Sequence, residues 1–238
     1  MAVQAVKPRL LDLFCGAGGA AMGYHRAGFE VVGVDIKPQP NYPFEFVQDD
    51  ALLFMREARF TRLCETFDAI HASPPCQLFT RANGGWVGRL SDDRHADLIT
   101  PTRELLEATG LPYVIENVVG APLRDPVTIC GTTLGLNVKR HRLFESNCPL
   151  MVPPCSGHER DYVICFGGGV RGRTHQLGRT PNNSGPILRR PTLPLKQGQE
   201  AMEIGWMDRH ELSQAIPPAY TELIGHQLLQ HIRAKAVA

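Results

Sequence analysis

Short apolar runs alternate with glycine turns and helical stretches along the first half of the chain, and this alternation limits the possible folds. Residues 10–14 are apolar apart from one aspartate, lead into a glycine turn at 15–19 and are followed by a helical stretch at 20–27 and a second apolar run at 30–34. This pattern predicts a β-turn-α-β unit. Further strands are predicted at 45–47, 67–72 and 113–115. Strands that alternate with helices indicate an α/β fold built on a doubly wound, mostly parallel sheet.

The regular pattern stops at about residue 147 and resumes at about 199. Between these points proline and glycine interrupt any long periodic element, although a short strand is predicted at 162–166. Helices are predicted before this segment at 51–59 and 98–109, and after it at 219–233. We therefore expect one main domain, formed by residues 1–147 and 199–238, and a small irregular lobe at 148–198.

Composition excludes a strongly basic protein but leaves room for a local anion-binding surface. The 238 residues carry a formal net charge of +1, whereas residues 148–200 contain seven Lys and Arg against three Asp and Glu. Such a segment is either a solvated loop region or a surface that faces a polyanion, and charge alone does not separate the two.

Cysteine usage and hydropathy favour a reduced cytoplasmic setting. The seven cysteines are scattered, no apolar signal segment precedes them, and no stretch has the length of a membrane span. Cys148, Cys155 and His158 lie close enough in the sequence to raise a metal site, with Cys165 as a further candidate. Their spacing is irregular, so we expect unligated thiols and no metal.

The glycine turn indicates a nucleoside-containing cofactor. Gly16, Gly18 and Ala21 fit the dinucleotide fingerprint, and Asp35 follows the second strand at the distance expected of a ribose-binding acid. The turn does not separate a nicotinamide cofactor from S-adenosylmethionine. Asp50, after the third strand, is either an adenine contact or a helix N-cap.

A cysteine and an acid follow two neighbouring strands. Cys76 comes at the end of Ser73-Pro74-Pro75-Cys76-Gln77, where two prolines stiffen the turn and so favour a nucleophile over a packed thiol. Glu116 follows an apolar strand, where burial tends to keep a carboxyl protonated. Both strand ends meet at one edge of a parallel sheet, which suggests covalent catalysis with a proton-handling partner. The polar, glycine-rich residues 79–89 are a candidate lid.

These motifs resemble those of the DNA (cytosine-5)-methyltransferases. The similarity covers nearly the full length and is weakest at 150–198. Its motifs are 12–19 at the glycine turn, 73–77 around the cysteine, 116–118 after the acid, 139–142 with its two arginines and 215–219 before the last helix. The resemblance implies a Rossmann-like fold that binds S-adenosylmethionine, with 148–198 as a small target-recognition region.

The resemblance also implies roles for individual residues. The catalytic set is Cys76, Glu116, Arg140 and Arg142. The cofactor set is Phe14, Gly16, Gly18, Gly19, Asp35, Ile36, Asp50, Pro74 and Gln214. The DNA-binding set is Gln77, Asn83, Gly84, Arg171, Arg173 and Arg179. Two positions depart from the family pattern: Val138 stands where the family usually has Gln, and Gln214 where it usually has Asn.

The implied activity is methyl transfer from S-adenosylmethionine to C5 of cytosine in duplex DNA, with the base flipped out and Cys76 bonded to its C6. The implied protein is a cytoplasmic monomer of a bacterial or phage-infected cell, of the kind found in restriction-modification. Three alternatives remain open. They are methylation of RNA, a DNA-binding relative that has lost catalysis, and a nicotinamide dehydrogenase supported only by the glycine turn.

Overall fold

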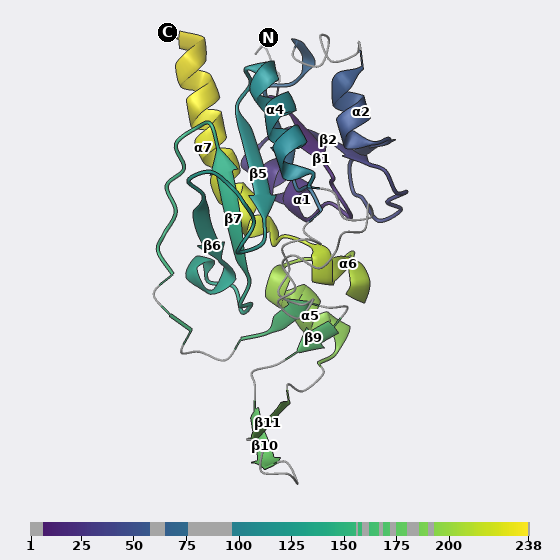
Figure 1. The fold of residues 1–238 in the computed structure, drawn as a ribbon, viewed down its shortest axis with the longest axis vertical. Coiled ribbons are helices and arrows are strands. Elements are labelled where there is room, and N and C mark those ends of the chain that lie inside the picture. The colour runs from purple at the N-terminus through teal and green to yellow at the C-terminus, as the bar shows by residue number, and fades with distance from the viewer. Residues whose placement is uncertain are drawn as a thin grey trace, which may run out of the picture.

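A seven-stranded sheet forms the centre of the computed structural model (Figure 1). The structure describes residues 7–57, 65–75, 97–155, 157–158, 162–166, 169–171, 175–179, 186–189 and 193–237. The strands are β1 (Arg9–Leu13), β2 (Glu30–Asp35), β3 (Glu45–Gln48), β4 (Ala69–Ala72), β5 (Tyr113–Asn117), β6 (Val127–Cys130) and β7 (His141–Ser146). Their order is β3-β2-β1-β4-β5-β7-β6.

The sheet is parallel except at one edge. β1 pairs in parallel with β2 and β4, and β4 in parallel with β5. β7 runs antiparallel to both β5 and β6. The strand order changes direction between β1 and β4, and ligands of doubly wound sheets bind outside the carboxyl ends of the strands at such a point. The expected α/β fold with a mostly parallel sheet is confirmed, whereas β6 and β7 were not predicted.

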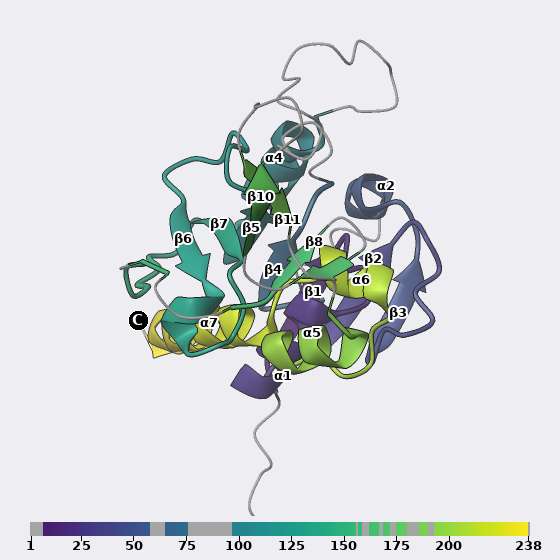
Figure 2. The same cartoon turned by 90° about the horizontal axis from the view of Figure 1, so that it is seen from below.

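Helices cover both faces of the sheet (Figure 2). α1 (Gly19–Ala27) and α7 (Pro218–Val237) pack together on one face, where Tyr24, Phe29 and Tyr220 are buried. α2 (Ala51–Arg56) and α4 (Ile99–Thr109) cover the other face, where Phe54 and Leu106 join a second core with β-strand side chains. Apolar strand residues that alternate between the faces supply both cores.

Local sequence explains where these helices begin and end. Asp50 caps α2 by accepting hydrogen bonds from the backbone N–H groups of Leu52 and Leu53. Gly28 ends α1 with a φ of 117°, a left-handed conformation that favours glycine. Gly110 ends α4 in the same way.

The C-terminal part of the chain returns to the glycine turn. The Thr221 hydroxyl on α7 donates to the Ala20 carbonyl oxygen over 2.8 Å, and both groups are buried. A Cβ at Gly19 would come within 2.5 Å of the Ile216 carbonyl oxygen, and a Cβ at Gly23 would overlap the Pro218 carbonyl oxygen and the Thr221 hydroxyl. Glycines in α1 therefore allow the segment before α7 to lie against the turn.

The remaining elements lie beyond the sheet. β8 (Ile164–Phe166) pairs with β9 (Gly169–Arg171), and β10 (His175–Arg179) pairs with β11 (Pro186–Arg189) in a hairpin that stands away from the sheet in Figure 1. α5 (Leu195–Met202) and α6 (Arg209–Gln214) follow. Among the described residues, no helix has both the length and the apolar character needed to cross a membrane.

The contact between α1 and α7 predicts the effect of Gly23→Ala. The added methyl group would overlap backbone and hydroxyl oxygen atoms, so we expect a loss of about 2–3 kcal/mol in the free energy of unfolding. Urea unfolding measures this change. Gly205→Ala is the control because a Cβ there meets no atom within 4 Å, and its free energy of unfolding should stay close to wild type. Equal stability of the two variants would contradict the predicted packing.

Candidate active site

Adjacent strand ends place the predicted residues along one edge of the sheet. Leu13 of β1 is in register with Ala72 of β4, and Ala72 is in register with Ile115 of β5. Phe14, Ser73 and Glu116 follow these three residues directly. The glycine turn, the proline turn and the acid therefore lie side by side at the carboxyl edge, where the strand order reverses.

The backbone of the glycine turn adopts left-handed conformations at three residues. Phe14, Gly16 and Gly18 have φ values of 57°, 50° and 81°, and Gly18 forms the N-cap of α1 without any side-chain cap. The carboxylate of Asp35 accepts hydrogen bonds from the backbone N–H of Gly16 (3.0 Å) and of Lys37 (2.9 Å). Asp35 thereby joins the ends of β1 and β2.

A buried carboxyl and an exposed apolar side chain lie near this turn. Asp12 is fully buried, and neither of its carboxyl oxygens makes a well-aligned hydrogen bond among the described residues. Burial raises its pKa well above the usual value, and the nearby Tyr42 hydroxyl lowers it only in part. The Ile36 side chain, next to Asp35, is 62% exposed. An orphaned buried acceptor and an exposed apolar side chain beside a glycine turn are features that a bound ligand would satisfy.

Three further positions singled out by the sequence, Asp50, Gln214 and Val138, make contacts within the protein. The carboxylate of Asp50 caps α2, as one of the two interpretations of this residue predicted. Gln214 at the end of α6 is exposed, and its Nε2 lies 3.4 Å from the Ser213 hydroxyl. Val138 is fully buried and bridges to Val163, so it fills apolar space where a glutamine side chain would need hydrogen-bond partners.

Glu116 is a buried acid beside an arginine. It is 7% exposed, and Arg142 Nε lies 2.8 Å from Glu116 Oε1. This ion pair lacks the alignment of a hydrogen bond, since Oε1 has no hydrogen-bond partner among the described residues. Burial raises the pKa of Glu116, while the charges of Arg142 and Arg140 and a contact with Ser73 lower it only in part. The expected tendency to hold a proton therefore agrees with this environment.

Arg140 and Arg142 contact different partners. Arg142 faces Glu116, whereas Arg140 is buried and donates to the carbonyl oxygens of Cys165 and Ser213, the latter over 2.9 Å. Its own carbonyl oxygen accepts a hydrogen bond from the Tyr220 hydroxyl. Burial lowers the pKa of Arg140 to about 9. Arg140 thus connects the start of β7 to β8, to α6 and to α7.

Asn117 connects the acid strand to the proline turn. Its side-chain Nδ2 donates to the Pro74 carbonyl oxygen over 2.9 Å in a buried setting. Pro74 and Pro75 are described, but the chain from 76 to 96 lies outside the described residues, and with it Cys76, Gln77, Asn83, Gly84 and the candidate lid. Arg173 also lies outside them, whereas Arg171 ends β9 and Arg179 ends β10.

A buried polar chain, not predicted from the sequence, leads to the proline turn. The Tyr24 hydroxyl lies 3.0 Å from His71 Nδ1, and His71 Nε2 lies 2.9 Å from the Ser73 hydroxyl. His71 is fully buried, and desolvation lowers its pKa to about 3. A histidine in the middle of an apolar strand was the only sequence signal for this neutral, hydrogen-bonded ring.

The N-terminal half of the chain is similar to a known family. Residues 8–123 match the family described as C-5 cytosine-specific DNA methylase. The match contains the glycine turn, Asp35, the proline turn and Glu116. The similarity to the C-5 cytosine-specific DNA methylases therefore includes the residues that meet at the carboxyl edge.

Curated relatives of the C-5 cytosine-specific DNA methylase region include type II methyltransferases. One is M1.HphI of Haemophilus parahaemolyticus, 32% identical over 119 residues that cover 45% of this chain and 32% of the relative. Another is M.PspPI of a Psychrobacter species, 30% identical over 150 residues that cover 57% of this chain and 33% of the relative. The alignments with these two span about a third of the relatives' length.

Solved structures share the fold. The Entamoeba histolytica methyltransferase EhMeth has a TM-score of 0.63 at 13% identity, over 95% of this chain and 99% of that one. The S. pombe Dnmt2 methyltransferase has a TM-score of 0.59 at 14% identity, over 94% of this chain and 99% of that one. The Rossmann-like arrangement expected of a C-5 cytosine-specific DNA methylase is thus confirmed for most of the chain.

His71 predicts a pH dependence of stability. Because its folded pKa of about 3 lies below the unfolded value of 6.5, the unfolded state binds the extra proton between these values. This group's contribution is complete above pH 6.5 and falls by about 1.4 kcal/mol per pH unit as the pH decreases. Urea unfolding at a series of pH values should show His71→Gln to be less stable at pH 7 but to have a flatter slope below pH 6.5.

The matched control is His226→Gln, at an exposed position on α7, which should follow the wild-type curve. A variant at His71 whose slope equals that of wild type would contradict a buried neutral ring.

Proposed function

We propose that this protein transfers a methyl group from S-adenosylmethionine to C5 of cytosine in duplex DNA. The observation that carries the proposal is the placement of Glu116, a buried acid whose pKa is raised by desolvation, beside the proline turn that leads to Cys76. The hydrogen bond from Asn117 to Pro74 joins the two. The match of residues 8–123 to the C-5 cytosine-specific DNA methylase family supports the choice of reaction.

The residues at the glycine turn suit an S-adenosylmethionine cofactor. The uncapped start of α1 at Gly18 and Gly19 favours a carboxylate, and the unpaired Asp12 carboxyl offers an acceptor to an amine or N–H donor. Asp35 is placed to receive ribose hydroxyls, and Phe14, exposed Ile36 and Asp50 to receive adenine. Pro74 and Gln214 are proposed to border the site. When bound, S-adenosylmethionine supplies an electrophilic methyl group.

Cys76 is proposed as the nucleophile. Its sulfur adds to C6 of the flipped cytosine, while protonated Glu116 donates a hydrogen bond to N3 and so favours the build-up of electron density at C5. C5 takes the methyl group, its proton leaves, and elimination of the thiolate restores the ring. The raised pKa of Glu116 supports its role as donor, because an ionised carboxylate could only accept.

The arginines are proposed to position these groups. Arg142 lies against Glu116 and is placed to orient the base. Arg140 donates to the carbonyl oxygens of Cys165 and Ser213 and accepts a hydrogen bond from the Tyr220 hydroxyl at its own carbonyl oxygen, and it is proposed to keep β7, α6 and the recognition segment in one arrangement around it. Their positive charges also favour a thiolate at a neighbouring cysteine.

Duplex DNA is proposed to bind along the irregular segment. The basic excess of residues 148–200 suits phosphate contacts, with Arg171, Arg173 and Arg179 in the recognition region 148–198 and Gln77, Asn83 and Gly84 at the proline turn and candidate lid. Flipping the target base costs a few kcal/mol of stacking and pairing, which contacts in the pocket must offset. We further propose a monomer that acts in the cytoplasm of a bacterial or phage-infected cell, in restriction-modification.

Substitution of the two reacting groups tests the mechanism. Cys76→Ser and Glu116→Ala should each lower the transfer of labelled methyl to cytosine-containing duplex DNA by at least about a thousandfold. Both variants should still bind S-adenosylmethionine in calorimetric titrations, because neither residue is proposed to hold the cofactor. The matched controls are Cys148→Ser and Glu107→Ala, which should keep wild-type turnover. Wild-type turnover in either reacting-group variant would defeat the assignment.

Comparison of substrates tests the partner. Labelled methyl transfer should be seen with duplex DNA, and DNA that carries 5-fluorocytosine at the target should trap a covalent complex that denaturing electrophoresis detects. Preferential methylation of tRNA would replace DNA with RNA as the substrate. Binding to DNA without any adduct would indicate a relative that has lost catalysis.

A further inference from the structure

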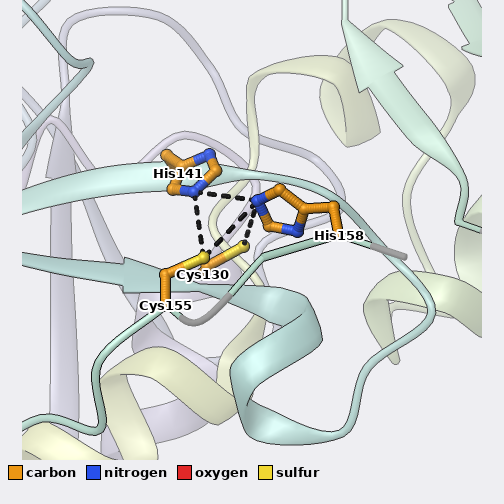
Figure 3. Close-up of side chains that lie close together, drawn as sticks. All are labelled: Cys130, His141, Cys155 and His158. Atoms are coloured by element: carbon orange, nitrogen blue, oxygen red, sulfur yellow. Dashed lines mark hydrogen bonds between the residues drawn. The ribbon is translucent and has the colours of Figure 1, made fainter. Parts of the chain in front are cut away.

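Four potential metal ligands converge where β6 and β7 meet the segment that follows them (Figure 3). They are Cys130, His141, Cys155 and His158, and their ligand atoms all lie within 4.8 Å of one another. The sequence suggested Cys148, Cys155 and His158 as neighbours, with Cys165 as a further candidate. The structure keeps only two of these in the cluster and completes it with residues from β6 and β7.

Three of the distances within the cluster are close to those of a tetrahedral coordination shell, and the distance from Cys130 to His158 is longer. With Zn–N bonds of about 2.0–2.1 Å and Zn–S bonds of about 2.3 Å, tetrahedral geometry requires separations of about 3.3–3.4 Å between nitrogens and about 3.5–3.6 Å between nitrogen and sulfur. The two Nε2 atoms of His141 and His158 are 3.2 Å apart. Cys155 Sγ lies 3.5 Å from His141 Nε2 and 3.4 Å from His158 Nε2, and Cys130 Sγ lies 4.0 Å from His158 Nε2.

Two of the ligands are held by the sheet. Cys130 is the last residue of β6, His141 is the first of β7, and the two are paired in the antiparallel register. Cys155 and His158 come from the segment that follows β7 and are separated by two residues, a spacing common in zinc-binding loops. Cys130 and His141, held by the β6–β7 hairpin, therefore face Cys155 and His158 on the segment that follows β7.

Thr132 supports the ring of His158 from outside the cluster. The Thr132 hydroxyl lies 3.1 Å from His158 Nδ1 and 3.3 Å from Cys130 Sγ. When Nδ1 carries the proton and donates to Thr132, Nε2 presents its lone pair to the point where the two sulfurs and the other ring nitrogen meet. Metal-binding histidines commonly donate their second N–H in this manner.

We propose that Cys130, His141, Cys155 and His158 form a structural zinc site. Four side-chain ligands close the coordination shell, which distinguishes a structural zinc from a catalytic one that keeps a position open for water. Two thiolates balance the charge of the ion, so the site adds no net charge to the partly buried hairpin.

The position of the site suggests what the metal does. His141 lies between Arg140 and Arg142 in the sequence. The chain just after the two connecting-segment ligands is already paired with the chain just before β7, because Val163 N–H donates to Asn137 O and Lys139 N–H donates to Val163 O. Zinc would fasten residues 155–158 to the β6–β7 hairpin. If the proposed function holds, it thereby fixes the base of the recognition segment relative to the catalytic arginines.

Cobalt titration of the reduced, metal-free full chain tests the site without depending on methyl transfer. We expect one equivalent of Co²⁺ to produce the intense visible bands of tetrahedral cobalt and a thiolate charge-transfer band, and one equivalent of Zn²⁺ to remove them. Cys155→Ser and His158→Ala should each weaken Co²⁺ binding by at least about a hundredfold, and Thr132→Val by about 10–100-fold.

Cys148→Ser is the matched control, since Cys148 lies in the same part of the chain but outside the cluster, and it should bind Co²⁺ like wild type. Circular dichroism should show every variant to be folded. Weak, octahedral cobalt bands in wild type would overturn the proposal, as would equal loss of binding in Cys148→Ser and Cys155→Ser. A Cys130–Cys155 disulfide in protein isolated under reducing conditions would overturn it too.

Discussion

The antiparallel pairing of β7 with β5 is the constraint on which the candidate site depends. It sets Glu116 opposite Phe144 and brings Arg142, two residues earlier on β7, against the Glu116 carboxylate. A carboxyl buried at the end of an apolar strand would be costly without a partner. The pairing supplies that partner as an ion pair, since Glu116 Oε1 faces Arg142 without an aligned hydrogen bond among the described residues. The same strand carries His141 into the cluster of potential metal ligands and follows Arg140, so β7 links the acid, the arginines and the proposed zinc site.

Buried polar groups at the carboxyl edge lie in two connected sets. One runs from Tyr24 through His71 to Ser73 and stiffens the turn before Cys76 from the side of α1. The other runs from Asn117 to Pro74 and holds the same turn from β5. Satisfied buried hydrogen bonds restrict side chains to one arrangement. The neutral state of His71 and the raised pKa of Glu116 both follow from desolvation, which acts on opposite charges and therefore shifts the two pKa values in opposite directions.

Residues 206–221 pack against the glycine turn and α1 at the carboxyl edge of the sheet. Gly19 and Gly23 bring α1 close to residues 216–218 and Thr221, and Trp206 donates to the Ala17 carbonyl oxygen within the glycine turn. Arg140 reaches α6 through Ser213. Segments that follow residues 148–198 therefore contact both the glycine turn and Arg140.

The sequence by itself determined the parallel strands and the glycine turn, and it singled out Cys76 and Glu116 as candidate catalytic residues. It could do so because short-range patterns of apolar residues, glycines and prolines specify the local backbone. It also favoured a raised pKa for Glu116, since burial follows from the apolar strand before it. Only the tertiary structure decided that β7 runs antiparallel, that Arg142 rather than Arg140 faces the acid, and that His71 lies in a buried polar chain. The four potential metal ligands are the clearest case of contacts that only the tertiary structure decides. Cys130 and His141 become neighbours through strand register. Cys155 and His158 join them through the path of the next segment, whose irregular composition gives no periodic pattern to predict it. Contacts between residues far apart in the chain depend on packing, and no local pattern encodes them.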